Sequence, residues 1–445
     1  MPLPNKSRKG FSMKQFRLTA AVIAICLLLS ACNTLNLNTS GLMSPPRAEG
    51  NQARILSLID ENAGGNYTLI YPASGEYKSA VIFRDLDGSG EDEAVALYRS
   101  ADNVTHILFA SRSGDSYTAI GEGTFTGSII ERVDFVDLDS DGCEELITCY
   151  PDGSSPLSTL SVMYAGDSVT QTNLPTCCTT YLPGDYDGDG TGDLLLLTLP
   201  STVGPASARL ITCIQGDFGE KAACSMDDSV SELCCLSFGN IGEGTVGAVV
   251  DGRSAQGEYT TQILYYDTAT HSLMNPLFVY GGYQDTRRPT AIMSGDIDSD
   301  GTIEIPICSL MDYAADEDVS SVCRKVTWNR FSPSAMSLAF QKTAVLCENL
   351  GFLLNLSGER TGAVTARYTG ENSVTFYEWS YRDGEPDRGD EVLTIRRYDK
   401  ESYDSSRIFE AVLCETNTVV YTYTLTDSER SYTPDEVAAA FVLTS

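Results

Sequence analysis

Histidine and tryptophan are scarce in this chain, with two residues of each among 445. His106 and His271 leave little room for imidazole-based acid–base catalysis, and we expect both to be structural. A Gly-x-Ser-x-Gly elbow, a phosphate-binding P-loop and a His-Glu-x-x-His motif are all absent. The sequence therefore shows no catalytic constellation, although paired carboxylates, as used by glycosidases, stay possible because acids are abundant.

Basic residues are also few, at 30 Lys and Arg against 61 Asp and Glu, a net charge of −31. Five of these bases and no acid fall within the first 31 residues, so the rest of the chain carries −36. Because phosphate contacts need a basic face, this composition argues against nucleic acid or an anionic lipid surface as a partner. Bound cations would relieve the repulsion among the acids.

A zinc-ligand pattern is missing, since the fourteen cysteines include no pair of Cys-x-x-Cys motifs. Twelve cysteines follow Cys26 and Cys32, which lie in the N-terminal segment. Several of the twelve fall in apolar, strand-like runs, where a thiol usually packs as a small hydrophobe. These are Cys149, Cys213, Cys308, Cys347 and Cys414. Export from the cytoplasm would permit disulfides, so mostly free thiols and one or more disulfides both stay open.

The N-terminal apolar run, LTAAVIAICLLLS, has thirteen residues and is too short for an ordinary membrane span. It follows a basic stretch and ends in Leu-Ser-Ala-Cys, which resembles a bacterial lipobox. The resemblance implies a signal peptide at residues 1–31, a lipidated Cys32 and a polar, flexible tether at 32–55. It also implies a bacterial membrane protein, held only by its lipid anchor and facing outside the cytoplasm. A plain secretory signal is the alternative.

An Asp-rich stretch, VDFVDLDSDGCEELITCY, begins at Val133, and related stretches begin at Ala80, Thr179 and Ala291. Each one has a nine-residue acidic loop between two apolar runs. Two degenerate copies, with loops from Asn240 and Asn355, keep the frame and lose most acids. The six loops start at positions 85, 137, 185, 240, 296 and 355, so the period is about fifty residues.

Each period contains short β-branched and aromatic runs separated by turn residues, which predicts four strands. Four strands per period are typical of a propeller blade, so we predict an all-β fold of about seven four-stranded blades at residues 56–445. The seventh blade would combine residues 406–425 with the terminal strand. One helix is expected near the end, with Thr433 as N-cap, Pro434 and Glu436. A row of sandwich domains is the alternative, but the repeat is short for it.

The acidic loops have the residue types that bind calcium. In the loop from Asp137, acids occupy positions 1, 3, 5 and 9, and Gly142 at position 6 permits a sharp turn. Calcium accepts six to eight hard oxygens, including a backbone carbonyl, whereas magnesium prefers fewer carboxylates and keeps its waters. An EF-hand is excluded because it needs a glutamate at position 12 between two helices.

The pattern Asp-x-Asp-x-Asp-Gly-x-x-Asp/Glu between strands resembles the FG-GAP/VCBS repeats of calcium-binding β-propellers, over about residues 80–365. The resemblance implies up to four structural Ca²⁺ ions and four ligand sets. These are Asp85, Asp87, Ser89 and Glu93; Asp137, Asp139, Asp141 and Glu145; Asp185, Asp187, Asp189 and Asp193; and Asp296, Asp298, Asp300 and Glu304. The first set has a serine at position 5, so we expect it to bind most weakly, and the degenerate loops should bind none.

Two functions are compatible with these features. The first is a non-enzymatic, membrane-anchored propeller that binds a protein or glycan or acts as a scaffold. The second is a calcium-stabilised propeller enzyme acting on polysaccharide, either a lyase or a hydrolase. For the second, the stretch with Tyr283, Arg287 and Arg288 is the first candidate for an active site.

Overall fold

The computed structural model describes residues 50–444 except 128, 152, 154–155, 203, 215, 280–281, 284–285, 315–317, 406–409 and 429. The predicted signal peptide, Cys32 and tether residues 33–49 lie outside the described residues. No helix within the described part is both long enough and apolar enough to cross a membrane.

Six antiparallel sheets of four or five strands make up most of the described chain, so the predicted all-β class is confirmed. The first sheet contains β1 (Tyr67–Leu69), β2 (Val81–Arg84), β3 (Glu93–Ser100), β4 (Val104–Ser113) and β5 (Ser116–Thr126). The second contains β6 (Arg132–Val136), β7 (Glu145–Pro151), β8 (Ser158–Ala165) and β9 (Val169–Asn173). The third contains β10 (Thr180–Gly184), β11 (Asp193–Thr198), β12 (Ser207–Ile214) and β13 (Asp217–Ser225).

The fourth sheet contains β14 (Val230–Gly242), β15 (Thr245–Ser254), β16 (Tyr259–Asp267) and β17 (Ser272–Met274), and the ribbon β18 (Phe278–Val279) and β19 (Gly282–Tyr283) follows it. The fifth contains β20 (Ile305–Leu310), β21 (Arg324–Ser332), β22 (Ser337–Cys347), β23 (Phe352–Leu356) and β29 (Phe441–Leu443). The sixth contains β24 (Val364–Gly370), β25 (Ser373–Arg382), β26 (Glu385–Asp399), β28 (Val419–Leu425) and β27 (Ala411–Glu415). The helices are α3 (Asn51–Ala63) and α4 (Pro434–Ala440), with two 3-10 turns at Val319–Ser321 and Glu348–Leu350.

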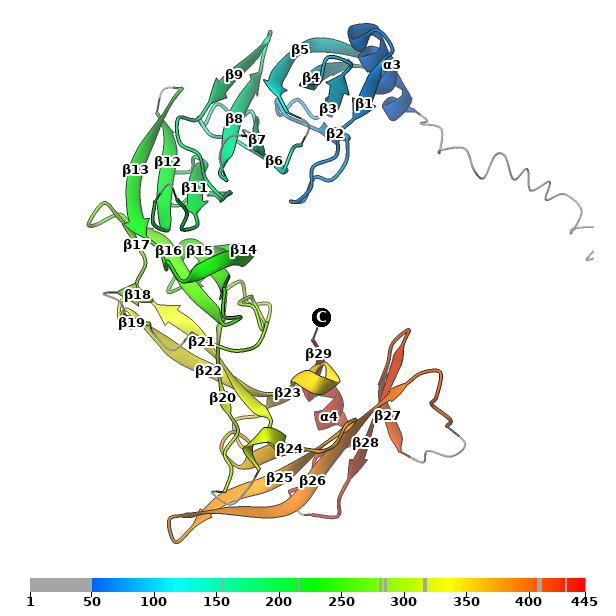
Figure 1. Ribbon diagram of the computed structural model, residues 1–445, viewed down its shortest axis with the longest axis vertical. Coiled ribbons are helices and arrows are strands. Elements are labelled where there is room, and N and C mark those ends of the chain that lie inside the picture. The colour runs from blue at the N-terminus through cyan, green and yellow to red at the C-terminus, as the bar shows by residue number, and fades with distance from the viewer. Residues whose placement is uncertain are drawn as a thin grey trace, which may run out of the picture.

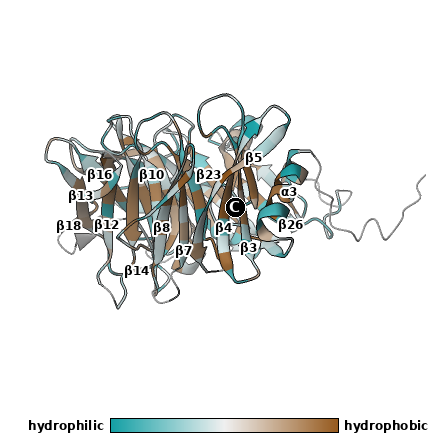
Figure 2. Ribbon diagram, turned by 90° about the horizontal axis from the view of Figure 1, so that it is seen from above, coloured by the Kyte–Doolittle hydropathy of each residue, from teal (hydrophilic) through white to brown (hydrophobic). Residues whose placement is uncertain are grey.

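The sheets follow one another in chain order along an open arc (Figure 1). In the first, second and fourth sheets, the first strand lies on the concave side of the arc and the last strand on the convex side. Seen from above, strands of neighbouring sheets stand side by side, and apolar residues concentrate along them (Figure 2). Within the described residues the arc does not close into a ring, so the seven-bladed propeller stays a prediction.

The residues predicted as a seventh blade do not form a sheet of their own. Strand β28 pairs with the long strand β26, and β27 continues the same sheet. The terminal strand β29 pairs instead with β23. Strand β23 itself pairs back onto β22, because only the 3-10 turn Glu348–Leu350 separates the two and antiparallel pairing needs no longer connection.

The hydrophobic core lies between the sheets, and β11 shows how it forms. Its residues Leu194 and Leu196 pack in one cluster with β7 and β8 of the second sheet. The alternate residues Leu195 and Leu197 pack in another cluster with β15 and β16 of the fourth sheet. Because side chains alternate along a strand, a sheet buried on both faces needs a continuous apolar run, which is what the Asp-Leu-Leu-Leu-Leu-Thr sequence supplies.

Helix α3 covers the outer face of the first sheet, where Ile55 and Ile59 are fully buried against β2, β3 and β4. Its first residue is Asn51, so the folded part begins before residue 56 and includes the last five residues of the predicted tether. This helix was not expected from the sequence. A ring would close by packing another sheet on a face of the first sheet, and α3 already occupies one of its two faces.

The predicted helix α4 is confirmed, with its capping box formed by Thr433 and Glu436 and with Pro434 in the first turn. The twelve cysteines from Cys143 to Cys414 are all free thiols, so the disulfide alternative is not what the structure shows. Cys149, Cys178, Cys323 and Cys347 are buried, as expected for thiols that pack as hydrophobes.

A buried ion pair connects the fourth sheet to the segment that leads into the fifth. Asp251 on β15 and Arg288 are almost completely buried, and their side chains meet at 2.7 Å. The Arg288 guanidinium also donates to the carbonyl oxygens of Thr286 and Ile292. The second Asp251 oxygen accepts the backbone N–H of Ser294 at 2.6 Å. Both charges are therefore satisfied inside the protein.

Replacing Arg288 by Met should lower the free energy of unfolding by about 3–5 kcal/mol, because Asp251 would stay buried without its partner. Arg287→Met is the matched control, since Arg287 lies on the surface and its pair with Glu258 spans 3.8 Å. We expect the control to change stability by less than about 1 kcal/mol. Urea denaturation of both variants measures the difference, and equal midpoints would contradict a structural role for Arg288.

Candidate metal sites

The four intact acidic loops occupy equivalent places in four sheets. Loop 1 (residues 85–93) connects β2 to β3, loop 2 (137–145) connects β6 to β7, and loop 3 (185–193) connects β10 to β11. Loop 4 (296–304) follows a short bridge between Gly295 and Glu304 and leads into β20. The predicted repeat thus corresponds to a repeated structural unit.

The backbone of the loops turns at the sixth position, where each loop has a glycine with a left-handed φ of 85–89°. In every loop an oxygen of the aspartate at position 1 accepts the N–H of that glycine, at 2.9–3.1 Å. A side chain with a Cβ is strained at such a φ. The glycine is therefore required by the turn, and the first aspartate stabilises the turn directly.

The acid at position 9 begins the second strand in loops 1 to 3 and directly precedes it in loop 4, and its side chain bonds back to the loop. One of its oxygens accepts the N–H of position 2, at 2.7–3.1 Å in all four loops. These acids are buried, with exposed fractions of 7% or less. They are Glu93, Glu145, Asp193 and Glu304. In loops 1 to 3 this bond places one buried carboxylate next to the acids at positions 1 and 3.

Four groups of three carboxylates could hold a metal ion, because their oxygens lie within 4.8 Å of one another. In loops 1 to 3 the group consists of positions 1, 3 and 9. These groups are Asp85, Asp87 and Glu93; Asp137, Asp139 and Glu145; and Asp185, Asp187 and Asp193. In loop 4 the group is Asp296, Asp298 and Asp300, all exposed, and Glu304 is not part of it.

The predicted acid ligands at position 5 of loops 2 and 3, Asp141 and Asp189, lie outside these groups, and loop 1 has a serine at this position. Ser89, Asp141 and Asp189 instead accept the N–H of position 7, at 3.3, 2.8 and 2.8 Å. This is the short-range bond that Asp and Ser side chains commonly make in turns. Position 5 therefore shapes the loop in this structure, and its place in a metal shell stays a prediction.

Burial and like charge act together on the converging acids. Burial, together with the nearby carboxylates of Asp139 and Asp141, raises the pKa of Glu145 to about 7. Burial likewise raises the pKa of Asp193 to about 6 and that of Glu93 above its usual value. These raised pKa values mean that the protein's own groups do not fully offset the negative charge of the ionised loops.

Loops 1 and 2 fit a hard cation best. One oxygen of Asp85 in loop 1 is buried and has no hydrogen-bond partner. Among the described residues, no lysine or arginine forms an ion pair with the acids at positions 1, 3, 5 and 9 of loop 2; Arg84 pairs with Glu144, at position 8. Oxygen-only donors, several carboxylates and a buried oxygen without a donor are what a calcium ion would satisfy.

The loops of neighbouring sheets contact one another. The N–H of Glu144 in loop 2 donates to the carbonyl of Leu86 in loop 1 at 2.8 Å. The N–H of Gly192 in loop 3 donates to the carbonyl of Asp137 in loop 2 at 2.9 Å. Arg84, directly before loop 1, also forms an ion pair with Glu144. Loops 1, 2 and 3 therefore form a continuous row along one edge of the stacked sheets.

The degenerate loop at residues 240–248 has become a tight hairpin. Strands β14 and β15 pair up to Gly242 and Thr245, and Glu243 and Gly244 turn with positive φ values of 52° and 75°. This is the backbone of a two-residue hairpin turn. Without the acids at positions 1, 3 and 9, no carboxylates converge there.

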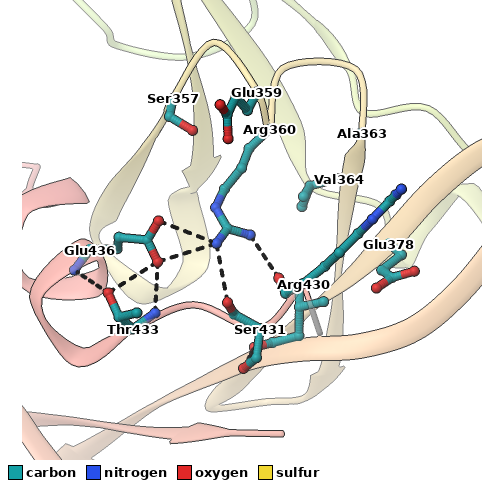
Figure 3. A pocket seen from close by; sticks show the side chains of 11 residues that line it. Ser357, Glu359, Arg360, Ala363, Val364, Glu378, Arg430, Ser431, Thr433 and Glu436 are labelled. Atoms are coloured by element: carbon teal, nitrogen blue, oxygen red, sulfur yellow. Dashed lines mark hydrogen bonds and ion pairs between the residues drawn. The ribbon is translucent and has the colours of Figure 1, made fainter. Parts of the chain in front are cut away.

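The degenerate loop at residues 355–363 contains Arg360, which bonds to the chain near helix α4 (Figure 3). Its guanidinium donates to the carbonyls of Arg430 and Ser431 at 3.0 and 3.3 Å and pairs with Glu436 at 3.3 Å. The same group stacks over the Tyr432 ring at 3.6 Å. A polar cavity of about 550 Å³ adjoins this contact. Arg360 thus has a structural role, fastening the loop to the C-terminal segment.

The two arginines suggested for an enzyme lie in different surroundings. Arg288 is buried in the ion pair with Asp251, Arg287 lies apart from it on the surface, and the side chain of Tyr283 is outside the described residues.

Ser100, His106 and Glu122 resemble a catalytic triad. The Ser100 hydroxyl lies 2.9 Å from His106 Nε2, and His106 Nδ1 lies 2.8 Å from the Glu122 carboxylate. The Ser100 hydroxyl, however, also has the carboxylate of Asp102 and the carbonyl of Val104 within bonding distance. A carboxylate is the stronger acceptor of the serine proton. The imidazole is therefore not the preferred acceptor of the Ser100 proton, and the structural role of His106 stays a prediction.

Stability without calcium should depend on pH through Glu145. Its folded pKa of about 7 exceeds the usual 4.5, so the folded protein binds more protons than the unfolded chain between these values. Stability should therefore fall as pH rises from about 4.5 to about 7 in a chelator. Glu145→Gln should flatten this slope, measured by thermal melting across pH, and an unchanged slope would contradict the assignment.

Sequence comparison adds no family to these observations: neither protein-family models nor the curated proteins match this chain.

Proposed function

We propose that this chain is a calcium-binding, lipid-anchored bacterial protein whose propeller-type sheets form a binding or scaffold module for a protein or glycan outside the cytoplasm. The observation that carries the proposal is the group of three converging carboxylates, one of them buried, that is repeated in loops 1 to 3. The FG-GAP/VCBS-like spacing of the acids supports the same conclusion.

Calcium matches the donors better than other common cations. Each of loops 1 to 3 offers three converging carboxylates, which suits the large, oxygen-rich shell of calcium. Asp85, Asp87 and Glu93 would hold the ion in loop 1, with the equivalent acids in loops 2 and 3. A bound ion supplies positive charge between two strands, and the residues of the loop orient the carboxylates through their backbone hydrogen bonds.

The arrangement of the sheets supports a propeller-type architecture. Sheets of four or five strands stack side by side, with apolar clusters between neighbouring sheets. In the first, second and fourth sheets the first strand lies on the concave side. These are properties of propeller blades. A closed ring of about seven blades is the finer form of this proposal, and solution scattering would distinguish a ring from an open arc.

Membrane attachment through Cys32 rests on the lipobox-like sequence alone. The negative charge of the rest of the chain is consistent with a protein that is held by lipid rather than by attraction to an anionic membrane surface. Cys32→Ala should therefore move the protein from the membrane fraction to the soluble fraction. A variant that stays in the membrane fraction would contradict lipid anchoring.

Calcium should raise the melting temperature of the protein relative to a chelator, because it removes the repulsion within the loops. The double variant Asp137→Asn, Asp139→Asn should lose part of this increase. The control is Asp115→Asn, Asp167→Asn, which removes two exposed acids outside the loops. Calorimetric melting measures all three proteins, and a melting temperature that does not respond to calcium would overturn the proposal.

The ligand class can be tested with a glycan array and a pulldown, each with calcium and with chelator. Retention of intact glycan or of a protein only with calcium would support a binding module whose fold needs the ion. Cleavage of the bound glycan would instead support the polysaccharide-enzyme alternative. Binding that is equal with chelator would separate the ligand site from the calcium loops.

A further inference from the structure

Loop 4 differs from the other three loops because a base reaches its acids. Arg330 on β21 donates from Nε to Glu304 at 2.6 Å and from Nη2 to Asp300 at 2.6 Å. The same Nη2 lies 3.3 Å from Asp298. One guanidinium thus contacts three of the four acids of loop 4.

The position of Arg330 can be compared between sheets through the strand register. Asn329 pairs with the residue after Glu304, and Arg330 is one residue further along β21. In each of the other three sheets, we take the residue that pairs with the one after position 9 and move one residue further along its strand. This gives Ser111 beside loop 1, Tyr164 beside loop 2 and Thr212 beside loop 3. At this cross-strand position, next to the acid at position 9, the other three loops have neutral residues.

The contact changes the geometry of the acids. In loops 1 to 3 the buried acid at position 9 converges with positions 1 and 3, whereas Glu304 is absent from the group in loop 4. One oxygen of Glu304 accepts from Arg330 and the other from the N–H of Ile297 at 3.1 Å. Both oxygens of this acid therefore have donors within the protein already.

Loop 3 also has a nearby base, but the contact is of another kind. Lys221 forms an ion pair with Asp187 alone, and Asp185, Asp187 and Asp193 still converge. A lysine provides one compact charge, whereas the planar guanidinium has five donors that bridge several carboxylates. Lys221 compensates part of the charge of loop 3 without replacing a metal ion.

We propose that Arg330 is the permanent cation of loop 4, so that the chain binds calcium in loops 1 to 3 only and the fifth sheet is held together without calcium. This inference rests on the proposed calcium-binding function. It departs from the sequence prediction, in which Asp296, Asp298, Asp300 and Glu304 form a fourth calcium site.

The test is the number of calcium ions bound per chain in equilibrium dialysis. The wild-type protein should bind three. Arg330→Thr introduces the residue type of Thr212, which occupies the equivalent position beside loop 3. This variant should bind four, since the acids of loop 4 are then left without a cation. A wild-type value of four would overturn the proposal, and so would a folded Arg330→Thr variant that still binds three.

A matched pair of variants keeps the test decisive if Arg330→Thr does not fold. Asp139→Asn in loop 2 and Asp298→Asn in loop 4 remove the same side chain at the same loop position. The first should lower the count from three to two, and the second should leave it at three. A loss of one ion in Asp298→Asn would overturn the role of Arg330. A wild-type protein that binds no calcium would overturn the proposed function itself.

Discussion

The structure depends on the repulsion between carboxylates that the repeat brings together. Each intact loop needs an aspartate at position 1 to hold the turn and an acid at position 9 to receive the N–H of position 2. These two hydrogen bonds place negative charges side by side, one of them buried. The fold therefore brings repelling carboxylates together at every intact loop. The six copies of the repeat differ mainly in how this repulsion is offset or avoided.

The copies of the repeat offset or avoid the repulsion between carboxylates in different ways. Loops 1 and 2 keep converging acids, and the described residues provide no base that bridges them. Loop 4 uses the guanidinium of Arg330, which reaches in from a neighbouring strand. The loop at residues 240–248 has lost the acids and needs only a two-residue turn. The loop at residues 355–363 keeps Glu359 and has an arginine of its own, Arg360, that bonds toward helix α4. Loss of charge and internal bases are thus alternatives to a bound ion.

Much of the fold could be predicted from the sequence because the repeat is local. The acidic loops, their glycines and the apolar runs on either side lie within about twenty residues of each other, so their spacing identifies the unit. Helix α3 was missed because its sequence is mostly polar and only Ile55 and Ile59 are fully buried. The seventh blade was wrong as a separate sheet because β28 and β29 pair with strands already present, which depends on contacts distant in sequence.

In the candidate metal sites, too, local features could be predicted from the sequence and features that depend on strand pairing could not. Positions 1, 3 and 9 were predicted correctly as a converging group in loops 1 to 3, since alternate positions of a tight loop face one point. Position 5 lies outside that group in loops 2 and 3, where its side chain accepts the N–H of position 7, and its place in a metal shell stays a prediction. Arg330 lies 26 residues after Glu304, and its role follows only from the pairing of two strands. An alignment of the repeats that included the third strand would have shown one arginine among three neutral residues.

Because the contacts between loops 1 to 3 join neighbours in the row, a loss of structure in one loop should spread as in a one-dimensional chain with nearest-neighbour coupling. Loop 2 is its middle element, bonded through Leu86 on one side and through Gly192 on the other. A disturbance that begins in loop 2 reaches two neighbours directly, whereas one that begins in loop 1 has only loop 2 to pass to among these three. The order of the loops along the edge, and not only their individual composition, therefore sets how widely a local loss of structure spreads.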